Sequence, residues 1–420
     1  MEKYGRLEAT LDNNSITGVA MPAIRNGFCQ RCAVNIKDSW RLPSGLSYCW
    51  HCAKYGRLTE QHYLYGVSEP HKFDAEQVQC TWSGKLTTEQ SKLSEDLLEG
   101  IKAKQDQLIF AVTGAGKTEM LYSSLTYCIN KKFRIAYLSP RIDVVQEIAA
   151  RIMKYYDVSF TMLHGEIKDT FQYQQITFAS VHQMYKFYHA FDLIVVDEAD
   201  AFPLSGDSSL WYALAQARSD QSVMIYMTAT LSQDLKKLME RKQLQVHTVL
   251  KRFHGQDLPN FKLNLILLHW KKRLPLDLKH KLSQKKAPWL IFVPVITDLA
   301  RLKELLEHWK LGLNIVIISS KHGQRRKLVE AFKVGTIDVV CTTIILERGL
   351  TIPNVQVCIL GVEDGKYTDE TLLQIAGRSG RDPQYPDGNL IIYCQELTKQ
   401  MQRIVKTIDD INRNRFLSTM

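Results

Sequence analysis

The sequence lacks a long apolar run, and it lacks a secretory leader. No stretch of its 420 residues approaches the roughly 20 apolar residues that a membrane-spanning helix needs. The segment Met1–Arg6 carries no apolar stretch followed by a cleavage site, so we expect no secretory signal. These absences argue against a membrane-spanning protein and against a secreted one. We therefore expect a cytoplasmic protein with reduced thiols, whose nine cysteines need an explanation other than disulfides.

The chain also has fewer acidic residues than basic ones. The chain has 54 Lys and Arg against 44 Asp and Glu, which gives a net charge of +10. This excess favours a polyanionic partner, either nucleic acid or an anionic membrane face, without choosing between them. At 420 residues and 45% hydrophobic content, the chain is long enough for two or three domains with sizeable cores.

Four cysteines form two C-x-x-C pairs, Cys29 with Cys32 and Cys49 with Cys52, with sixteen residues between the pairs. This spacing is typical of zinc ribbons, because each pair presents two thiolates to one ion. Four sulfur ligands close the tetrahedron, so we predict a structural zinc site rather than a catalytic one. His51, inside the second pair, is an alternative ligand, although four cysteines suffice.

The pattern along the chain predicts three folded parts. Residues 1–60 resemble a small metal-stapled module, and residues 61–85 read as a connector. From residue 86 onward, short apolar strands alternate with amphipathic helices, which predicts an α/β fold with parallel sheets. The alternation breaks near Arg252, so we expect one domain over 86–252, a linker over 253–260 and a second domain over 261–420.

A phosphate-binding loop is predicted at Ala111–Thr118, which reads Ala-Val-Thr-Gly-Ala-Gly-Lys-Thr. It lies between a predicted strand at 108–112 and a predicted helix at 119–129. Backbone N–H groups of such a loop wrap a polyphosphate, and Lys117 reaches its terminal groups. The hydroxyl of Thr118 is then available to Mg²⁺.

A second cluster, Asp197–Asp200, follows the apolar run at 193–196. Ligands bind at the carboxyl ends of parallel strands. We therefore expect Asp197 to hold Mg²⁺ and Glu198 to orient or deprotonate the attacking water. A solvated acidic turn is the alternative interpretation.

A third cluster, Gln374–Arg381, falls in the second predicted domain. Arg378 and Arg381 are three residues apart and would share one face of a helical turn. We expect them to reach the γ-phosphate as arginine fingers. Ordinary surface arginines are the alternative.

Taken in order, these segments and Thr228–Thr230 resemble motifs I, II, III and VI of superfamily-two helicases, over roughly residues 86–395. Further segments resemble four more motifs of that superfamily, namely Ser139–Arg141 (Ia), Thr177–Gln183 (Ib), Ile291–Pro294 (IV) and Thr343–Gly349 (V). The resemblance implies two tandem RecA-like parallel-sheet domains behind the four-cysteine module.

Details narrow the resemblance. Ile375 and Thr351 depart from the DEAD-box group, and the motor motifs look closer to the primosomal helicase PriA. In PriA, however, the zinc-binding cysteines lie within the second motor domain, whereas here they precede the motor. This arrangement resembles the competence family ComFA. It implies a nucleic-acid-stimulated ATPase that drives single-stranded DNA into the cytoplasm during natural transformation.

The resemblance also implies cofactors and site residues. The cofactors are ATP, Mg²⁺ and Zn²⁺. The residues expected to bind the nucleotide are Gln90, Val112, Thr113, Gly114, Ala115, Gly116, Lys117, Thr118 and Glu119. Those expected to act in hydrolysis are Lys117, Asp197, Glu198, Gln374, Arg378 and Arg381. Those expected to contact nucleic acid are Pro140, Arg141, Ser180, His182, Thr343 and Arg348.

Several alternatives stay open. The motor could be a PriA-like or DEAD-box-like helicase in DNA repair, replication restart or RNA remodelling. It could also be a nucleotide-switched scaffold that binds nucleic acid without turnover. The resemblance adds a membrane DNA-uptake channel and cytoplasmic competence proteins as partners, and it leaves open self-association and a location at the inner face of the cell membrane.

Overall fold

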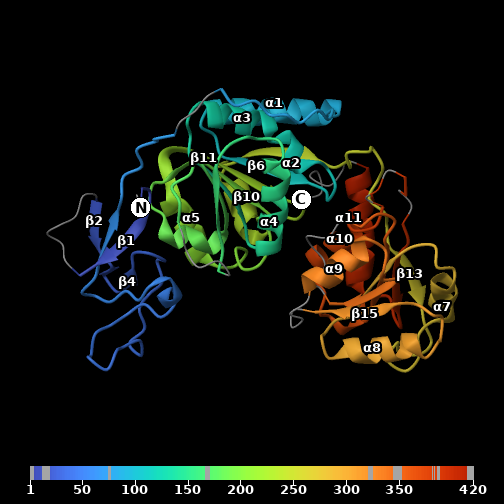
Figure 1. Ribbon diagram of the computed structural model, residues 1–420. Helices are drawn as coiled ribbons and strands as arrows, with labels where there is room; N and C mark the ends of the chain where they lie inside the picture. The colour runs from blue at the N-terminus through green and yellow to red at the C-terminus, as the bar shows by residue number, and fades with distance from the viewer. Residues whose placement is uncertain are drawn as a thin grey trace. The chain divides into compact units, whose positions relative to one another are not determined.

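We analysed a computed structural model, which describes residues 4–11, 19–73, 77–165, 171–319, 325–343, 352–380, 382, 384–385 and 388–413. The chain divides into two compact units (Figure 1). The first contains residues 1–110 and 116–248, and the second contains residues 111–115 and 249–420. Within the described ranges, no helix is long and apolar enough to cross a membrane.

The N-terminal part of the first unit is a small β module. Strands β1 (Leu7–Thr10), β5 (Tyr63–Gly66) and β2 (Val19–Pro22) form an antiparallel sheet in that order. A second ribbon, β3 (Ile24–Arg25) with β4 (Phe28–Cys29), leads into the first cysteine pair.

The expected connector at 61–85 therefore differs from the structure, because it contributes the central strand β5 of this sheet. The strand alternates partly buried and buried residues, and Leu64 is buried between the two tyrosines. A period of two is the mark of a strand with one covered face.

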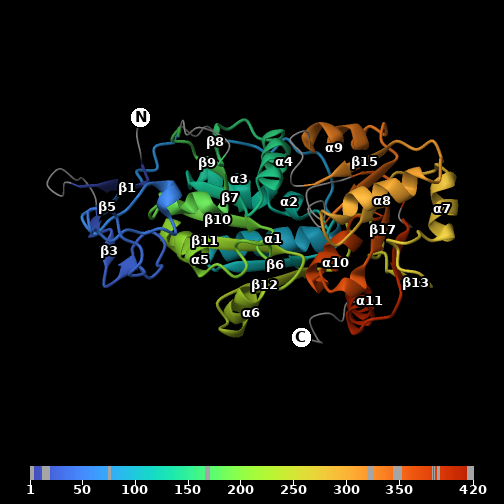
Figure 2. The same ribbon diagram turned by 90° about the horizontal axis from the view of Figure 1, so that it is seen from below.

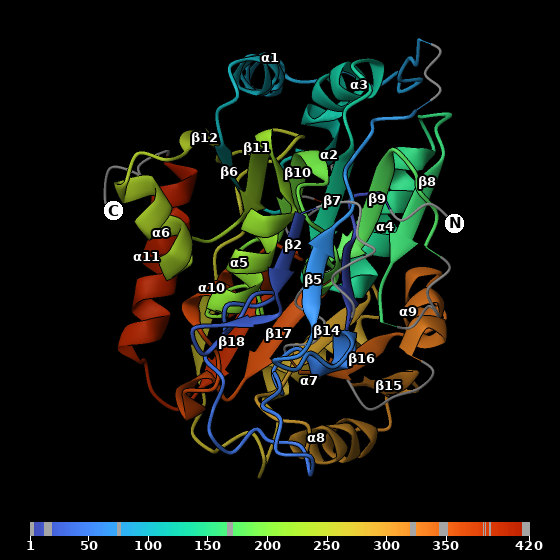
Figure 3. The ribbon, with the colours of Figure 1, turned by 90° about the vertical axis from the view of Figure 1, so that its left-hand side faces the viewer.

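The main sheet of the first unit has seven strands in the order β12-β6-β11-β10-β7-β9-β8, which Figure 3 shows side by side. The strands are β6 (Gln107–Ala111), β7 (Ile135–Ser139), β8 (Phe160–Leu163), β9 (Ile176–Ser180), β10 (Phe191–Asp197), β11 (Arg218–Thr228) and β12 (Gln245–Val249). All pairs from β6 to β8 are parallel. The helices are α1 (Thr88–Lys102), α2 (Lys117–Met120), α3 (Tyr122–Asn130), α4 (Ile142–Met153), the 3₁₀ helix η2 (Val181–Lys186), α5 (Ser208–Ala217) and α6 (Gln233–Glu240).

The helix expected at 119–129 is in two pieces. The N–H of Leu121 bonds to the carbonyl of Thr118, three residues back, at 3.2 Å. This tighter bond separates α2 from α3, because an α-helix requires a partner four residues back.

The second unit contains a six-stranded, all-parallel sheet in the order β13-β18-β17-β14-β16-β15. Its strands are β13 (Lys262–Leu265), β14 (Trp289–Phe292), β15 (Ile315–Ile318), β16 (Val339–Thr342), β17 (Gln356–Leu360) and β18 (Leu390–Cys394). Its helices are α7 (Leu276–Ser283), α8 (Asp298–Glu307), α9 (Arg325–Lys333), the 3₁₀ helix η4 (Val362–Asp364), α10 (Asp369–Ala376) and α11 (Lys399–Asn412). Two parallel-sheet α/β domains behind a four-cysteine module confirm the predicted fold class.

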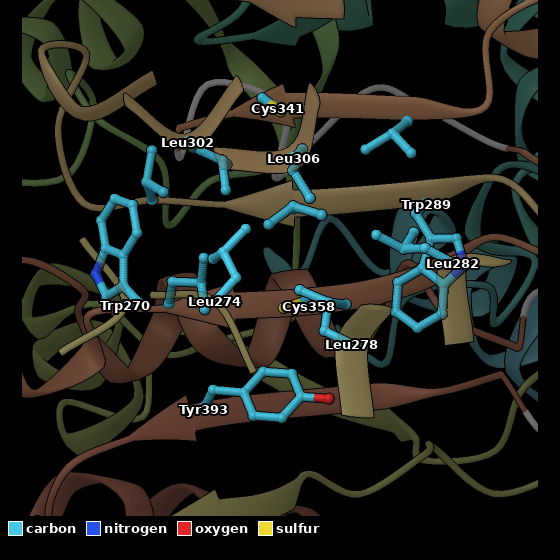
Figure 4. Close-up of a cluster of buried hydrophobic side chains, with 14 of the residues drawn as sticks. Trp270, Leu274, Leu278, Leu282, Trp289, Leu302, Leu306, Cys341, Cys358 and Tyr393 are labelled. Atoms are coloured by element: carbon cyan, nitrogen blue, oxygen red, sulfur yellow. The ribbon is translucent and has the colours of Figure 1, made fainter. Parts of the chain in front are cut away.

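One core cluster of the second unit lies between its sheet and helices α7 and α8. Figure 4 shows Leu278 and Leu282 of α7 beside Trp289 and Tyr393 of the sheet. Strand residues buried on both faces give the continuous apolar runs that the sequence shows.

This packing predicts a stability difference within one helix. Leu278 is 0% exposed, whereas Leu276, two residues earlier, is 61% exposed. Leu278→Ala should lower the free energy of unfolding by about 2–5 kcal/mol, because it removes buried methyl groups and leaves a cavity. Leu276→Ala is the matched control and should change it by less than about 0.5 kcal/mol. Denaturant unfolding measures both variants, and equal effects would contradict the packing.

Candidate nucleotide and metal sites

The predicted phosphate loop has the backbone that its glycines allow. It leaves β6 and enters α2 with Gly114 at φ +84° and Gly116 at φ +74°. Both values lie in the left-handed region, where glycine is strongly favoured. Gly116 is also crowded, because a Cβ there would lie 2.7 Å from Nε2 of Gln90. The expected nucleotide-reading residue Gln90 thus lies against the loop.

Gln90 is held in place by the start of α1. Its N–H donates to Oγ1 of Thr87 at 3.3 Å, and its Oε1 accepts from the N–H of Thr87 at 2.8 Å. This is a reciprocal capping box. From its sequence, Gln90 is expected to contact the nucleotide, and its capping role was not predicted.

The predicted carboxylates lie at the end of β10. Lys117 Nζ is 4.0 Å from Oδ1 of Asp197, so the structure brings these two predicted residues together. The N–H of Glu198 donates to the same oxygen at 2.8 Å. Glu198 has φ +53°, an uncommon conformation for a residue other than glycine. Such strain is concentrated at functional sites.

A tyrosine lies near this carboxylate. Complete burial raises the pKa of Tyr137 well above its ordinary value, and the charge of Asp197 acts in the same direction. The phenol therefore stays protonated and adds no charge to the site. Thr118, the other expected Mg²⁺ ligand, is buried in the first turn of α2.

Motif III connects to the acidic cluster. Oγ1 of Thr230 donates to Oδ2 of Asp200, and the N–H of Thr230 donates to Oγ1 of Thr228 at 3.1 Å. The N–H of Ala199 also bonds to the carbonyl of Met227 at 3.0 Å. The ends of β10 and β11 are therefore fastened together. The motif can be recognised from its residues, but nothing in the sequence indicates the Asp200–Thr230 bond.

In the second unit, the first half of the phosphate loop is hydrogen-bonded to the last residue of β12 and to the segment that follows this strand. The N–H of Val112 bonds to the carbonyl of Val249 at 3.1 Å. The N–H of Phe253 bonds to the carbonyl of Gly114 at 3.0 Å. Strand pairing therefore extends past β6 into the loop itself.

The structure describes three of the remaining predicted residues of the second unit and leaves two outside the described ranges. Gln374 lies buried in α10, and Arg378 is also buried. The helix ends at Ala376, and Arg378 lies in the hydrogen-bonded turn beyond it, where its N–H bonds to the carbonyl of Ile375 at 3.0 Å. Thr343 is buried directly after β16. Arg381 and Arg348 lie outside the described residues.

The four paired cysteines form one cluster. Their sulfur atoms all lie within 4.8 Å of one another, and three of the separations are 3.5 Å (Cys49–Cys52), 3.6 Å (Cys32–Cys49) and 3.7 Å (Cys29–Cys52). A tetrahedral site with Zn–S bonds of about 2.3 Å has S–S edges of about 3.8 Å. The donor set and its dimensions therefore fit zinc.

The hydrogen bonds within this cluster divide its thiols: the pKa of Cys49 and Cys52 lies below the ordinary value, and that of Cys29 and Cys32 lies above it. Cys29 and Cys32 hold the pKa of the Cys49 thiol below its ordinary value. The guanidinium of Arg31 donates to the sulfur of Cys52 from Nε at 3.3 Å and from Nη2 at 3.1 Å. It offsets part of the negative charge that four thiolates bring, as outer-sphere partners of metal sites do. Arg31 was not among the predicted site residues, although it lies between the two cysteines of the first pair.

His51 is not part of the cysteine cluster. Its Nε2 lies 2.9 Å from Oγ of Ser209 in α5. Oγ of Ser209 also lies 2.6 Å from the hydroxyl of Tyr185 in η2. The alternative ligand therefore fastens the cysteine module to the main sheet domain of the same unit, beside which Figure 2 shows the module.

Three of the expected nucleic-acid residues line one groove of the first unit: Pro140, Ser180 and His182. Arg141 lies between two of its lining residues and forms an ion pair with Asp143, with Nη2 3.0 Å from Oδ2. The sequence alone does not show that the side chain of Arg141 pairs with Asp143.

Comparisons with known proteins agree with this geometry. Residues 83–233 match the family described as "Type III restriction enzyme, res subunit", and residues 270–383 match "Helicase conserved C-terminal domain". The solved structure of S. cerevisiae Dbp5 bound to RNA and ADP BeF3 is similar in fold. Its TM-score is 0.56 at 16% identity, and the match covers 78% of this chain and 91% of that one.

Two curated relatives match almost the whole chain. Competence protein ComFA of Streptococcus pneumoniae is 34% identical over 404 residues, which cover 94% of this chain and 93% of the relative. Competence protein ComFA of Bacillus subtilis is 33% identical, over 91% of this chain and 85% of the relative. The chain is therefore a helicase-type ATPase of superfamily two, and it belongs to the ComFA family of competence proteins.

Proposed function

We propose that this chain is an ATP-driven motor that moves along single-stranded DNA and brings transforming DNA into the cytoplasm. Membership of the ComFA family supports the competence role, and the net charge of +10 supports a polyanionic track. The observation that best supports ATP hydrolysis is the position of Lys117 near Asp197, beside a glycine-rich loop. It joins a phosphate-binding cation to a metal-binding carboxylate, as nucleotide hydrolysis requires.

The proposed roles in the first unit follow the chemistry of each side chain. The backbone of Val112–Glu119 holds the phosphates, with Lys117 on the terminal groups. Thr118 and Asp197 would hold Mg²⁺, which when bound neutralises the charge that develops on the phosphates. Glu198 orients the attacking water and accepts its proton.

Two further groups complete the proposed nucleotide site. Gln90 contacts the base, a role that its place against the phosphate loop supports. In the second unit, Gln374, Arg378 and Arg381 act on the γ-phosphate. An arginine finger contributes on the order of 10³–10⁵ in rate.

The finer partners and location are also part of the proposal. The track is single-stranded DNA, contacted by Pro140, Arg141, Ser180, His182, Thr343 and Arg348. The protein works in the cytoplasm or at the inner face of the cell membrane, with an uptake channel and competence proteins. The proposed domains are residues 1–60, 86–252 and 261–420, joined by segments 61–85 and 253–260. Strand β5 lies within 61–85 but belongs to the sheet of the first domain.

Steady-state rates of ATP hydrolysis test both the motor activity and which nucleic acid stimulates it. Single-stranded DNA should raise the rate by at least about tenfold, which corresponds to about 1.4 kcal/mol of activation free energy. A duplex of the same sequence and the matching RNA should raise it less. Stimulation by RNA above that by DNA would instead indicate an RNA-remodelling helicase. Absence of turnover with every polymer would indicate a nucleotide-switched scaffold.

A further inference from the structure

A groove of about 490 Å³ opens on the first unit, between the cysteine module and the main sheet domain. The module supplies two of its lining residues, Lys54 and Tyr55, and the others come from the segments after β7 and β8 and from the end of β9 and η2, among them Ser180, His182, Gln183 and Lys186.

The lining of this groove suits an anion. It includes the ammonium groups of Lys54 and Lys186, and none of its described residues is acidic. Burial, the charge of Lys54 and that of His51 hold the pKa of His182 below its ordinary value, whereas the nearby Asp207 acts in the opposite direction. His182 is therefore mostly neutral at pH 7 and offers hydrogen bonds, while the two lysines supply the positive charge.

A buried amide in the groove also lacks a partner. Gln183 is 4% exposed and lines the groove, and its Oε1 has no hydrogen-bond partner in the part of the chain that the structure describes. Buried polar groups are nearly always hydrogen-bonded, so an exception indicates a missing partner.

The cysteine cluster fixes the position of Lys54. The 3₁₀ helix η1 (Ala53–Tyr55) begins directly after Cys52, and Lys54 is its middle residue. Arg31 holds this turn, because its Nη2 donates to the carbonyl of Cys52 at 2.7 Å and its Nη1 donates to that of Tyr55 at 2.8 Å.

The same turn packs on η2, the 3₁₀ helix that begins within motif Ib. The ring of Tyr55 lies 5.2 Å from that of Tyr185 in η2, between centroids. His51 and Tyr185 also both contact the hydroxyl of Ser209. The second cysteine pair, η1 and η2 are therefore one connected structure, and residues of both η1 and η2 line the groove.

We propose that the second cysteine pair and η1 form one wall of the nucleic-acid groove, with Lys54 contacting a phosphate of a single strand that also lies along Ser180 and His182. The inference rests on the proposed nucleic-acid motor and adds a role for the metal. By holding Arg31 and Cys52, the cluster positions a phosphate-binding lysine that the motor motifs do not contain.

Replacing Lys54 tests this wall directly. Lys54 is exposed, so Lys54→Glu should leave the fold and the metal content unchanged. The full chain is titrated against a fluorescent oligo(dT) of about 20 nucleotides, and anisotropy is followed over a range of salt concentrations. Kd should rise about tenfold, and the slope of log K against log salt should shrink by about 0.7, which is the loss of one phosphate contact on a single strand.

Lys37→Glu is the matched control. Lys37 is an exposed lysine of the same module, beside Trp40 and outside the described lining of the groove. The net charge changes equally in both variants, so Lys37→Glu should shift Kd by less than about twofold. Equal shifts of Kd in the two variants, or no shift in Lys54→Glu, would show that Lys54 does not contact the single strand. This surface would then be assigned to a protein partner. If the unchanged protein neither binds the oligonucleotide nor responds to it in ATP hydrolysis, the motor itself is wrong.

Discussion

Lys117→Ala should lower the rate of ATP hydrolysis by at least about 10²–10³-fold, the cost of removing one preorganised group that stabilises the transition state. The loop conformation depends on Gly114 and Gly116, and the lysine side chain points to Asp197. Its removal takes away a cation that contacts the transferred phosphate and leaves the backbone cradle in place. Fold and metal content should therefore be unchanged.

The rate is measured with saturating single-stranded DNA, and circular dichroism checks the fold. Lys92→Ala is the matched control, since Lys92 is exposed on α1 of the same unit and alanine favours a helix. It should retain the full rate. Turnover that survives Lys117→Ala at more than about a tenth of the original rate would remove the phosphate loop from the mechanism.

The double replacement Cys29→Ser, Cys32→Ser should release the zinc and unfold the cysteine module. Structural zinc contributes about 10–16 kcal/mol to the folding of such modules, far more than the few contacts around it. The seven-stranded sheet has its own core, so the ATPase domain should stay folded. We expect DNA affinity to fall with the metal, because Lys54 loses its support.

Metal analysis gives the zinc content, and hydrogen exchange over residues 19–66 reports the loosening. Cys80→Ser is the control, because Cys80 is a cysteine outside the cluster and should keep one zinc per chain. One zinc per chain in the double variant would show that Cys29 and Cys32 are not ligands. Exchange that stays slow after the metal has left would show that hydrophobic packing alone holds the module.

Features with a local cause could be predicted from sequence. The phosphate loop is specified by two glycines that must have positive φ, and β10 by an apolar run buried on both faces. The cysteine cluster follows from two pairs at a spacing that one ion can bridge. Each depends on residues close together in the chain.

Features that depend on distant partners were missed or wrong. Strand β5 pairs with β1 and β2, more than 40 residues away, and looked like a connector. The bonds from Arg31 to Cys52 and from Thr230 to Asp200 join segments that only the fold brings together. The groove beside Lys54 likewise requires four separate segments, so no single motif reveals it.

The bonds between the phosphate loop and the start of the interdomain segment bear on how the protein can be cut. A fragment that ends at Thr248 would lose Val249 and Phe253, the two residues that pair with Val112 and Gly114. An N-terminal half prepared for crystallisation or nucleotide titration should therefore run at least through Phe253, one residue past the boundary that the sequence suggests. A nucleotide titration of a shorter half would measure the affinity of a phosphate loop that has lost these hydrogen bonds.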